Sequence, residues 1–295
     1  MESAATRESR ISGCLFGGAL GDALGYPVEF LDERAIRKFY GDGIEALPLT
    51  NGRALISDDT QMTLYTAAGL LYGLTRTGKK PELQDLWLAC REWLATQGDR
   101  SRMDGSPRIW LSRLPAFYAL RAPGSTCLTA IHALPEGGTM EKPANASRGC
   151  GSIMRVAPIG LFAYHRTDLD AAVFAAQAAA LTHGDPLAYA SSAVFAQLIH
   201  EIVWHTPPRP APGELRAQMR RAVRAAARKL PAAAPLVDGV ERALTLADDA
   251  DVSDTDGIHR LGGGFLADEA LYIALFCAAR HPDSFTSAVG AATRH

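Results

Sequence analysis

The sequence predicts an all-α protein. Alanine is abundant, β-branched runs with strict alternation are scarce, and apolar residues recur at helical spacing in long segments. Residues 191–203 illustrate this spacing, which is typical of a helix with one buried stripe. The apolar residues of that stripe are Val194, Leu198, Ile199 and Ile202.

Eight candidate helices run along the chain. They span residues 9–25, 59–74, 82–95, 169–181, 187–204, 213–229, 237–247 and 266–279. The proline-rich segment 206–213 is the clearest break between them. Helical patterns of similar character lie on both sides of it, so we expect it to join two helices of a single domain that covers residues 1–295. A second connection, 137–151, is long and polar, as functional loops in compact domains often are.

Composition excludes several classes of protein. The chain has 295 residues and is 47% hydrophobic, which suffices for a sizeable core. A formal charge of -2 provides no overall field toward nucleic acid or an anionic membrane, so neither is expected as a partner. The five cysteines form no CxxC pair and are expected to be reduced. The polar N-terminus has no apolar signal-peptide core, and no apolar run reaches transmembrane length, which together predict a cytoplasmic location.

Two adjacent carboxylates flanked by two hydroxyls begin one of the candidate helices, as Ser57-Asp58-Asp59-Thr60. Hard oxygen ligands of this kind suit Mg²⁺ or Ca²⁺. The same residues are also a good helix start, with Ser57 as the cap and both aspartates facing the positive end of the helix dipole. Taken alone, the cluster fits capping better than a metal site.

Glycines four residues apart share one face of the first candidate helix, at positions 13, 17, 21 and 25. This face predicts close packing against another helix, with the close approach of a ligand as the alternative. Asp22 lies in the same apolar surface and needs a partner if it is buried, either a metal-bound water or a neighbouring helix end. Pro27 predicts a loop after this helix, and Glu29 in that loop is a candidate carboxylate at the mouth of a pocket.

A Gly-x-Gly turn, Gly149-Cys150-Gly151, leads into an apolar segment that contains Ser152 and Met154. Glycines let backbone N–H groups converge on an anion, and a helix start adds its dipole, so the turn would suit a diphosphate. A simple turn explains the pattern equally well, because it matches neither a P-loop nor a dinucleotide fingerprint. Cys150 is interpreted as a small buried residue rather than a nucleophile, since no histidine lies nearby in the sequence.

Two further motifs are less specific. His183 ends an apolar helix before a Gly-Asp-Pro stop, where it could bind a ligand or simply be favoured by the helix dipole. The acidic segment 253–257 looks like a second metal loop. It lacks an apolar frame and the spacing of an EF-hand, so we expect a solvated loop there.

In their order and spacing, these motifs resemble the ADP-ribosylglycohydrolase family. That family includes dinitrogenase-reductase-activating glycohydrolase, the ADP-ribosylhydrolases and, in bacteria, immunity proteins against ADP-ribosylating toxins. The resemblance covers nearly the whole chain and implies an all-α orthogonal helix bundle with a binuclear Mg²⁺ site. The matching segments are residues 17–25, Glu29, and residues 57–60, 149–158, 181–186 and 261–271.

The resemblance also implies roles for individual residues. Ser57, Asp58 and Asp59 would be metal ligands, and Glu29 and Asp59 would serve the catalytic step. The other candidates would bind the diphosphate and distal ribose of the substrate or support that binding. They are Asp22, Gly149, Cys150, Gly151, Ser152, Met154 and His183.

The implied reaction is Mg²⁺-dependent hydrolysis of ADP-ribose from a modified protein side chain, most often arginine. The metal would hold the ribose hydroxyls and orient a water toward the anomeric carbon, while carboxylates stabilise the oxocarbenium character of the transition state. The expected partner is an ADP-ribosylated protein.

One departure from the family pattern leaves an alternative. Members carry a second acidic motif, Gly-Asp-Ser/Thr-Asp-Ser/Thr, after the helix that corresponds to residues 284–295, and the sequence stops at His295. We expect a truncation. The alternative is a non-catalytic ADP-ribose-binding protein, or an immunity protein that blocks an ADP-ribosyltransferase toxin.

Overall fold

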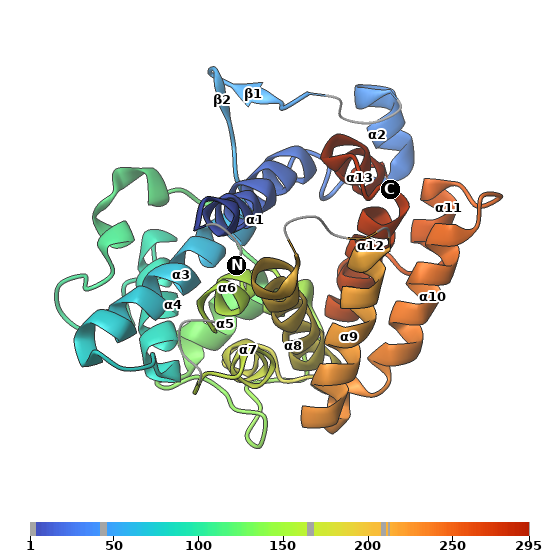
Figure 1. Cartoon of the computed structure of the whole chain (residues 1–295). Helices are drawn as coiled ribbons and strands as arrows, with labels where there is room; N and C mark the ends of the chain where they lie inside the picture. The colour runs from blue at the N-terminus through green and yellow to red at the C-terminus, as the bar shows by residue number, and fades with distance from the viewer. Residues whose placement is uncertain (1–3, 42–45, 164–167, 208–210, 212, 295) are drawn as a thin grey trace.

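The structure is a computed structural model that describes residues 4–41, 46–163, 168–207, 211 and 213–294. Regular structure in these residues is almost entirely helical, which confirms the all-α prediction (Figure 1). The α-helices are α1 (Ala4–Gly25), α2 (Glu33–Tyr40), α3 (Asp58–Thr77), α4 (Leu83–Thr96), α5 (Ser125–Ala133), α6 (Ala157–Phe162), α7 (Ala171–Ala180), α8 (Pro186–His200), α9 (Glu214–Lys229), α10 (Leu236–Asp248), α11 (Asp254–His259), α12 (Ala267–Arg280) and α13 (Phe285–Ala292).

Shorter elements connect these helices. The 3₁₀ turns are η1 (Trp110–Arg113), η2 (Pro115–Phe117), η3 (Cys150–Ser152) and η6 (Pro231–Ala233), and η5 (Glu201–His205) is a π-helical turn. A single small hairpin, β1 (Leu49–Thr50) with β2 (Arg53–Ala54), is the sheet found in the described residues. Its turn, Asn51-Gly52, has positive φ at both positions, which is the conformation that Asn-Gly favours. None of the described helices is long and apolar enough to cross a membrane.

All eight candidate helices are present. Their ends differ from the prediction by a few residues, most at α1, which begins at Ala4 rather than at residue 9. The candidate helix 187–204 keeps α-helical geometry only to His200 and then continues as the π turn η5. Five α-helices were not among the eight candidates, namely α2, α5, α6, α11 and α13, and only for α13 did the family resemblance imply a helix.

The acidic segment 253–257 is not the solvated loop that we expected. Ser253 accepts a hydrogen bond from the Asp256 N–H and so begins α11. Asp254 lies 3.6 Å from Arg280 Nε and 3.0 Å from His281 Nε2. The segment is therefore a capped helix start held to the end of α12 by charge, because its acidic side chains find partners that are distant in the sequence.

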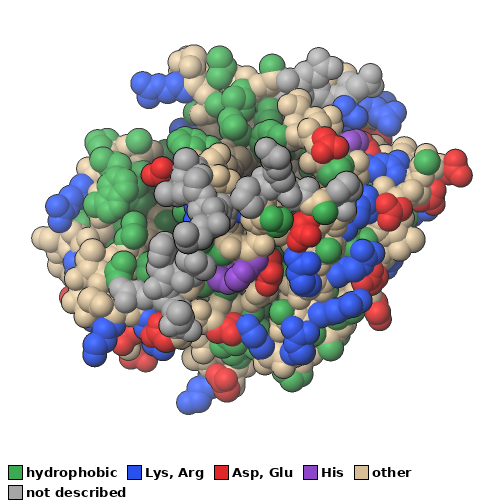
Figure 2. Space-filling view, viewed as in Figure 1, with side chains coloured by type: hydrophobic (Ala, Val, Ile, Leu, Met, Phe, Trp, Pro, Cys, Tyr) green, Lys and Arg blue, Asp and Glu red, His purple; other side chains and the backbone are tan. Residues whose placement is uncertain are grey.

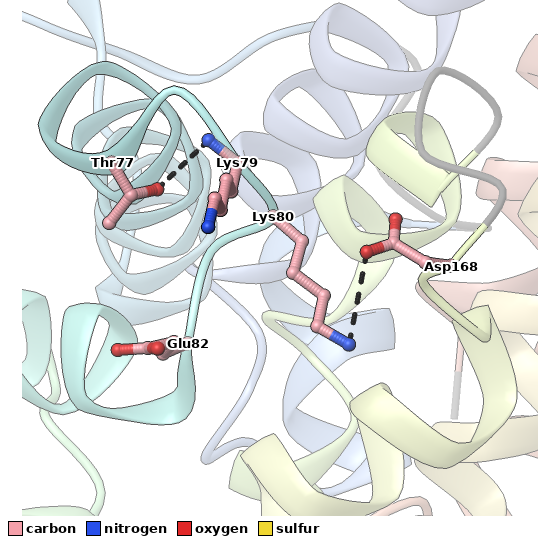
Figure 3. Close-up of a pocket in the computed structure, with 5 residues that line it drawn as sticks. All are labelled: Thr77, Lys79, Lys80, Glu82 and Asp168. Carbon is pink, nitrogen blue, oxygen red and sulfur yellow. Dashed lines mark hydrogen bonds and ion pairs between the residues drawn. The ribbon is translucent and has the colours of Figure 1, made fainter.

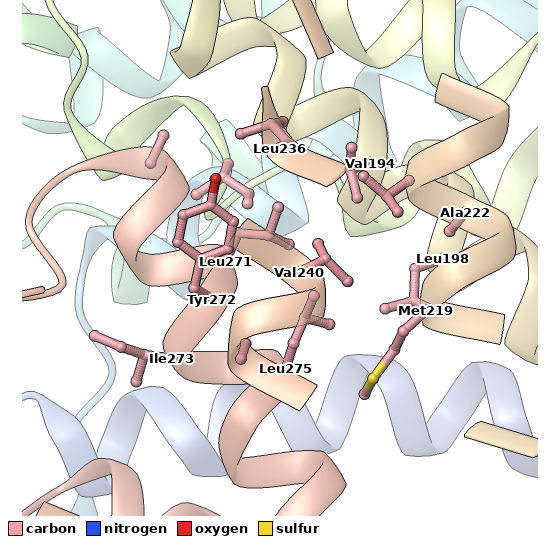
Figure 4. Close-up of a cluster of buried hydrophobic side chains, with 14 of the residues drawn as sticks. Val194, Leu198, Met219, Ala222, Leu236, Val240, Leu271, Tyr272, Ile273 and Leu275 are labelled. Atoms are coloured by element: carbon pink, nitrogen blue, oxygen red, sulfur yellow. The ribbon is translucent and has the colours of Figure 1, made fainter. Parts of the chain in front are cut away.

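The larger hydrophobic core lies among α8, α9, α10 and α12. Figure 4 shows its side chains meeting from these helices, with Leu198 from α8 near Met219 from α9, and Val240 from α10 near Leu275 from α12. Because α8 and α9 share this core, the segment between them joins two helices that pack together. Its residues 208–210 and 212 lie outside the described part of the chain.

A second core packs α3 against α4, with Tyr65 and Trp93 almost completely buried. The two helices approach closely at Gly69, where a Cβ atom would lie 3.0 Å from the Asp85 carbonyl oxygen. Glycine at this position therefore lets α4 lie directly against α3. This contact fixes the axis of α3, and α3 carries the acidic cluster at its amino end.

The glycine face of α1 does not pack tightly, contrary to the prediction. Among the described residues, a Cβ at Gly13 or Gly21 would meet nothing within 4 Å, and one at Gly17 would meet only the Phe285 ring, at 3.6 Å. The helix buries a different side, because its larger apolar residues can gain contacts there and glycine cannot. The residues on that side are Ile11, Cys14 and Leu15, which pack near Val203 and Trp204.

Candidate functional site

The amino end of α3 is fully capped without the carboxylates of Asp58 and Asp59. A helix leaves its first four N–H groups without partners inside the helix, and here all four have acceptors from other groups. The acceptors are Asp22 Oδ2 for Ser57 N (2.9 Å), Arg121 O for Asp58 N (2.9 Å), Ser57 Oγ for Asp59 N (3.1 Å) and Asp22 Oδ2 for Thr60 N (3.1 Å). The capping interpretation therefore holds for Ser57, and Asp58 and Asp59 lie in the first turn, where the helix dipole favours them but no amide requires their carboxylates.

Asp22 supplies part of this cap from a different helix. Its carboxylate accepts hydrogen bonds from the Ser57 N–H, at 3.0 and 2.9 Å, and from both the N–H and the hydroxyl of Thr60. Of the two partners expected for Asp22, the structure has the neighbouring helix end. Thr60 belongs to the sequence motif but had no individual role assigned there. In the structure its hydroxyl joins α1 to α3.

Three carboxylates remain at this end of α3, namely Glu29, Asp58 and Asp59. Asp58 Oδ2 accepts from the Gly124 N–H at 2.9 Å, and Asp59 Oδ2 accepts from the Ser57 hydroxyl at 3.0 Å. Within the described residues no cation contributes to the electrostatic environment of any of the three. They form a cluster of like charges that no described side chain neutralises, which we call the carboxylate cluster.

Burial and mutual repulsion both act on the carboxylate cluster. Burial is the larger cause, and it raises the pKa of Glu29 and of Asp58 to about 7 and that of Asp59 to about 6. The charge of Asp59 raises the pKa of Glu29 and Asp58 further, and the charge of Asp22 does the same to Asp59. These side chains are therefore close enough for the charge of one to raise the pKa of another.

The donor atoms of the carboxylate cluster and of Ser57 are all oxygen, so their chemistry fits Mg²⁺ better than a metal that prefers nitrogen or sulfur. Uncompensated negative charge is also what a divalent cation would neutralise. The described side chains do not already converge as a group of three or more His, Cys, Asp or Glu around one metal position.

The glycine turn 149–151 is clamped to the start of α12. The Cys150 N–H donates to the Phe265 carbonyl and the Ala267 N–H donates to the Arg148 carbonyl, each at 2.9 Å. The Arg148 guanidinium forms a two-point ion pair with the buried Asp268. Sequence reasoning assigned no role to Arg148 or Asp268, although a charged residue inside the apolar frame of α12 was a signal that it needs a partner.

The glycine turn faces the carboxylate cluster. Burial raises the pKa of the Cys150 thiol to about 12, and the charges of Asp59, Glu29 and Asp58 add to the shift. The thiol is therefore protonated near pH 7, consistent with our interpretation that Cys150 is not a nucleophile. The Thr63 hydroxyl of α3 donates to the Met154 carbonyl at 3.0 Å, which holds α3 against this segment.

His183 lies directly behind the two glycines and is only 1% exposed. A Cβ at Gly149 would lie 3.4 Å from His183 Nε2, and one at Gly151 would lie 3.1 Å from Cε1. Glycine at both positions therefore lets the backbone pass over the imidazole. Burial, followed by the charge of Arg155, lowers the pKa of His183 to about 3, so the ring is neutral. Its interpretation as a charged side chain favoured by the helix dipole is not supported.

A buried network orients the His183 ring. Arg155 Nη2 donates to Thr182 Oγ1 at 2.6 Å, and Thr182 Oγ1 lies 2.8 Å from His183 Nδ1. A hydroxyl that accepts from arginine can donate its own hydrogen to Nδ1, and in the tautomer that accepts this bond the ring hydrogen lies on Nε2. Among the described residues Nε2 has no hydrogen-bond partner, and it lies on the side of the glycine turn.

Two of the other candidates support the turn from within. Ser152 is fully buried, and its hydroxyl lies 3.0 Å from the Gly149 carbonyl and 3.3 Å from the Ala188 carbonyl. Met154 is partly buried against the core of α3 and α4. The structure thus brings together all of the site residues that the sequence suggested, around the amino end of α3 and the turn 149–151.

A surface pocket elsewhere on α3 is separate from this site. It is lined by Thr77, Lys79, Lys80, Glu82 and Asp168, with Lys80 Nζ 3.9 Å from Asp168 Oδ2 (Figure 3). These residues lie at the carboxyl end of α3, and a helix of 20 residues is about 30 Å long. The pocket therefore does not contact the carboxylate cluster.

Comparison with known proteins gives a consistent result. A family model described as ADP-ribosylglycohydrolase matches residues 3–295. The uncharacterized protein YegU of Escherichia coli is 30% identical over 207 residues, which cover 67% of this chain and 55% of YegU. The ADP-ribosyl-[dinitrogen reductase] glycohydrolase of Rhodospirillum rubrum is 29% identical over 201 residues, which cover 66% of this chain and 58% of that protein. The chain thus spans about half the length of these curated relatives. It belongs to the ADP-ribosylglycohydrolase family.

Proposed function

We propose that this protein releases ADP-ribose from ADP-ribosylated protein side chains by a Mg²⁺-dependent hydrolysis, with ADP-ribosyl-arginine as the substrate. Membership of the family supports the ADP-ribosyl part of the proposal. The observation that carries the proposal is the carboxylate cluster, because α3 is capped without it and no described cation neutralises it. Acidic groups that the fold leaves unpaired beside a glycine turn are available for a ligand.

Ser57, Asp58 and Asp59 would hold the Mg²⁺. When bound, the ion supplies positive charge that orients the ribose hydroxyls and a water molecule. The Gly124 N–H keeps Asp58 in place, and the Ser57 hydroxyl does the same for Asp59. These contacts would hold the carboxylates in position before the ligand arrives.

Glu29 is the proposed group for proton transfer. Its pKa of about 7 lets the carboxyl group both hold and release a proton near neutral pH. In the proposed reaction the water oxygen forms a bond to the anomeric carbon and the bond from that carbon to the arginine nitrogen breaks. Protonated Glu29 gives its proton to the leaving nitrogen and takes one from the water, so the carboxyl group returns to its starting state, while the charge of Asp59 stabilises the positive anomeric carbon.

The glycine turn is the proposed binding site for the diphosphate. The Nε2–H of His183 and the backbone of Gly149 and Gly151 lie together there, and the neutral ring can donate without a charge of its own. The buried Arg155 adds positive charge behind the ring, since its guanidinium is bonded to Thr182, to the Ala178 carbonyl and to no described carboxylate. Both features favour an anion.

The test is release of free ADP-ribose from a mono-ADP-ribosylated arginine substrate, with and without Mg²⁺. We expect release only with Mg²⁺, and loss of release in Asp59→Ala. The matched control is Asp251→Ala, an exposed aspartate outside the site, which should act like the wild type. Absence of release by the wild type under both conditions would rule out this linkage. If Asp59→Ala still protects cells against an ADP-ribosyltransferase toxin, the non-catalytic alternative is favoured.

A further inference from the structure

The end of α8 brings two histidines together in an unusual way. Along a regular α-helix, residues five apart lie about 140° apart around the axis and point to different sides. His200 and His205 are five apart, but the π turn η5 widens the helix between them. Their Nε2 atoms lie 3.2 Å from each other, and the ring planes meet at 63°. The π turn is therefore what makes this pair possible.

The separation of the two nitrogens matches a shared metal ion. Two imidazoles bound to one tetrahedral ion at about 2.0–2.1 Å have nitrogens about 3.3 Å apart. A hydrogen bond from one ring to the other has a similar length, so distance alone does not choose between them. The surroundings of the two rings are compatible with a shared ion, and the proposal rests on them together with this distance.

The rings have the exposure and the partners that metal ligation needs. His205 is exposed, and histidine side chains gather at the surface where α8 ends (Figure 2). Among the described residues, Nδ1 of His200 is buried without a partner at hydrogen-bond geometry, and the Gly160 carbonyl is an acceptor for this histidine. Coordination through Nε2 would fix the ring hydrogen on Nδ1, on the side of this carbonyl, which is a common arrangement for metal-bound histidine.

We propose that His200 and His205 form a binding site for a divalent transition-metal ion that prefers imidazole nitrogen, with Zn²⁺ as the probe ion. Water would fill the remaining positions, because the nearby Glu201 is already engaged by Gln197 at 3.1 Å. The site is distinct from the carboxylate cluster, whose oxygen ligands suit Mg²⁺. It does not depend on the proposed hydrolase activity.

Metal binding at this pair would stabilise the π turn. The turn is held to α1 by Arg10, whose Nη1 donates to the Val203 carbonyl at 3.3 Å and to the Thr206 carbonyl at 2.7 Å. An ion that joins both ends of the turn would favour this folded geometry over the alternatives, and the gain in stability would follow the concentration of the ion.

The test is a calorimetric titration of the full chain with Zn²⁺, near neutral pH and with Mg²⁺ in large excess to occupy oxygen sites. We expect the wild type to bind one Zn²⁺. The affinity of His205→Gln for Zn²⁺ should be lower by about tenfold or by more. His259→Gln is the matched control, since it removes an exposed histidine that is not part of the pair, and it should keep the wild-type affinity.

A second measurement covers the possibility that His205→Gln perturbs the turn. In the unaltered protein, Zn²⁺ should shift the imidazole NMR signals of His200 and His205 and leave that of His259 in place. The proposal is overturned if the wild type does not bind Zn²⁺, if His205→Gln binds it as tightly as the wild type, or if these two imidazole signals do not move.

Discussion

Two regions of this molecule differ in how many hydrogen-bond donors surround their buried acidic side chains. In α4, Glu92 accepts hydrogen bonds from the Arg108 N–H at 2.8 Å, the Ile109 N–H at 3.0 Å and the Ser112 hydroxyl at 2.9 Å. At the amino end of α3, the carboxylate cluster has few donors and no described cation. The fold satisfies the acids that it uses for architecture, so the unsatisfied ones indicate where a ligand is missing.

The largest effect on stability is expected from removing Glu92, the buried acid whose hydrogen bonds the fold satisfies. Glu92→Ala should lower the free energy of unfolding by about 3 to 5 kcal/mol, because a buried N–H group, a partly buried N–H group and a buried hydroxyl lose their acceptor. Urea denaturation followed by circular dichroism measures the change. Glu141→Ala, at an exposed acid, is the control and should stay within about 0.5 kcal/mol. Equal stability of the two variants would contradict the assignment of Glu92.

Removing an acid from the carboxylate cluster should have the opposite effect on stability at high pH. The pKa of Asp58 is raised to about 7 from 3.8, so the folded protein binds more protons than the unfolded chain between these two values. Stability of the metal-free protein should therefore fall as the pH rises from about 4 to about 7. Asp58→Asn should flatten this fall and raise the stability at pH 8 by about 1 kcal/mol, since counter-ions screen part of the repulsion.

Unfolding midpoints across this pH range, measured with a chelator present, test the expectation. Added Mg²⁺ should recover stability at pH 8 in the wild type and much less in Asp58→Asn. A pH profile of Asp58→Asn that superimposes on that of the wild type would contradict the raised pKa of Asp58, which burial and then the charge of Asp59 cause.

A smaller effect is expected behind the glycine turn. Thr182→Val keeps the shape of the side chain but removes the hydroxyl between Arg155 and His183. The ring hydrogen should then no longer be fixed on Nε2, and the KM for the ADP-ribosylated substrate should rise about fivefold with kcat little changed. Nitrogen NMR of His183 reads the tautomer without any activity assay. Thr75→Val, at an exposed threonine, is the control, and identical His183 spectra in both variants would refute the network.

The long helices could be predicted because their apolar stripes extend over several turns. The short helices α5 and α6, of 9 and 6 residues, could not, since fewer than three turns give little periodicity. The hairpin was within reach, because Asn51-Gly52 is a strong turn signal. The glycine face of α1 misled us, since spacing shows which residues share a face but not whether another helix covers it.

Asp58 and Asp59 were visible in the sequence because they are adjacent, and the family resemblance placed Glu29 with them. The environment of the carboxylate cluster was not visible. Asp58 is held by Gly124, 66 residues away, and His183 is neutral because the fold buries it beside Arg155. Contacts of this kind arise only when distant helices pack, so a single sequence indicates the reactive groups but not their protonation state.

The cap that Asp22 provides also sets an order of assembly. Two amides in the first turn of α3, those of Ser57 and Thr60, take their acceptor from a side chain 35 and 38 residues earlier. They gain protection from hydrogen exchange only after α1 has docked, and docking also brings Asp22 toward the repelling charge of Asp59. The first turn of α3 would then open more readily than the rest of the helix, and a cation that neutralises the carboxylates would close it. Backbone exchange at two amides would thereby report whether the site is filled.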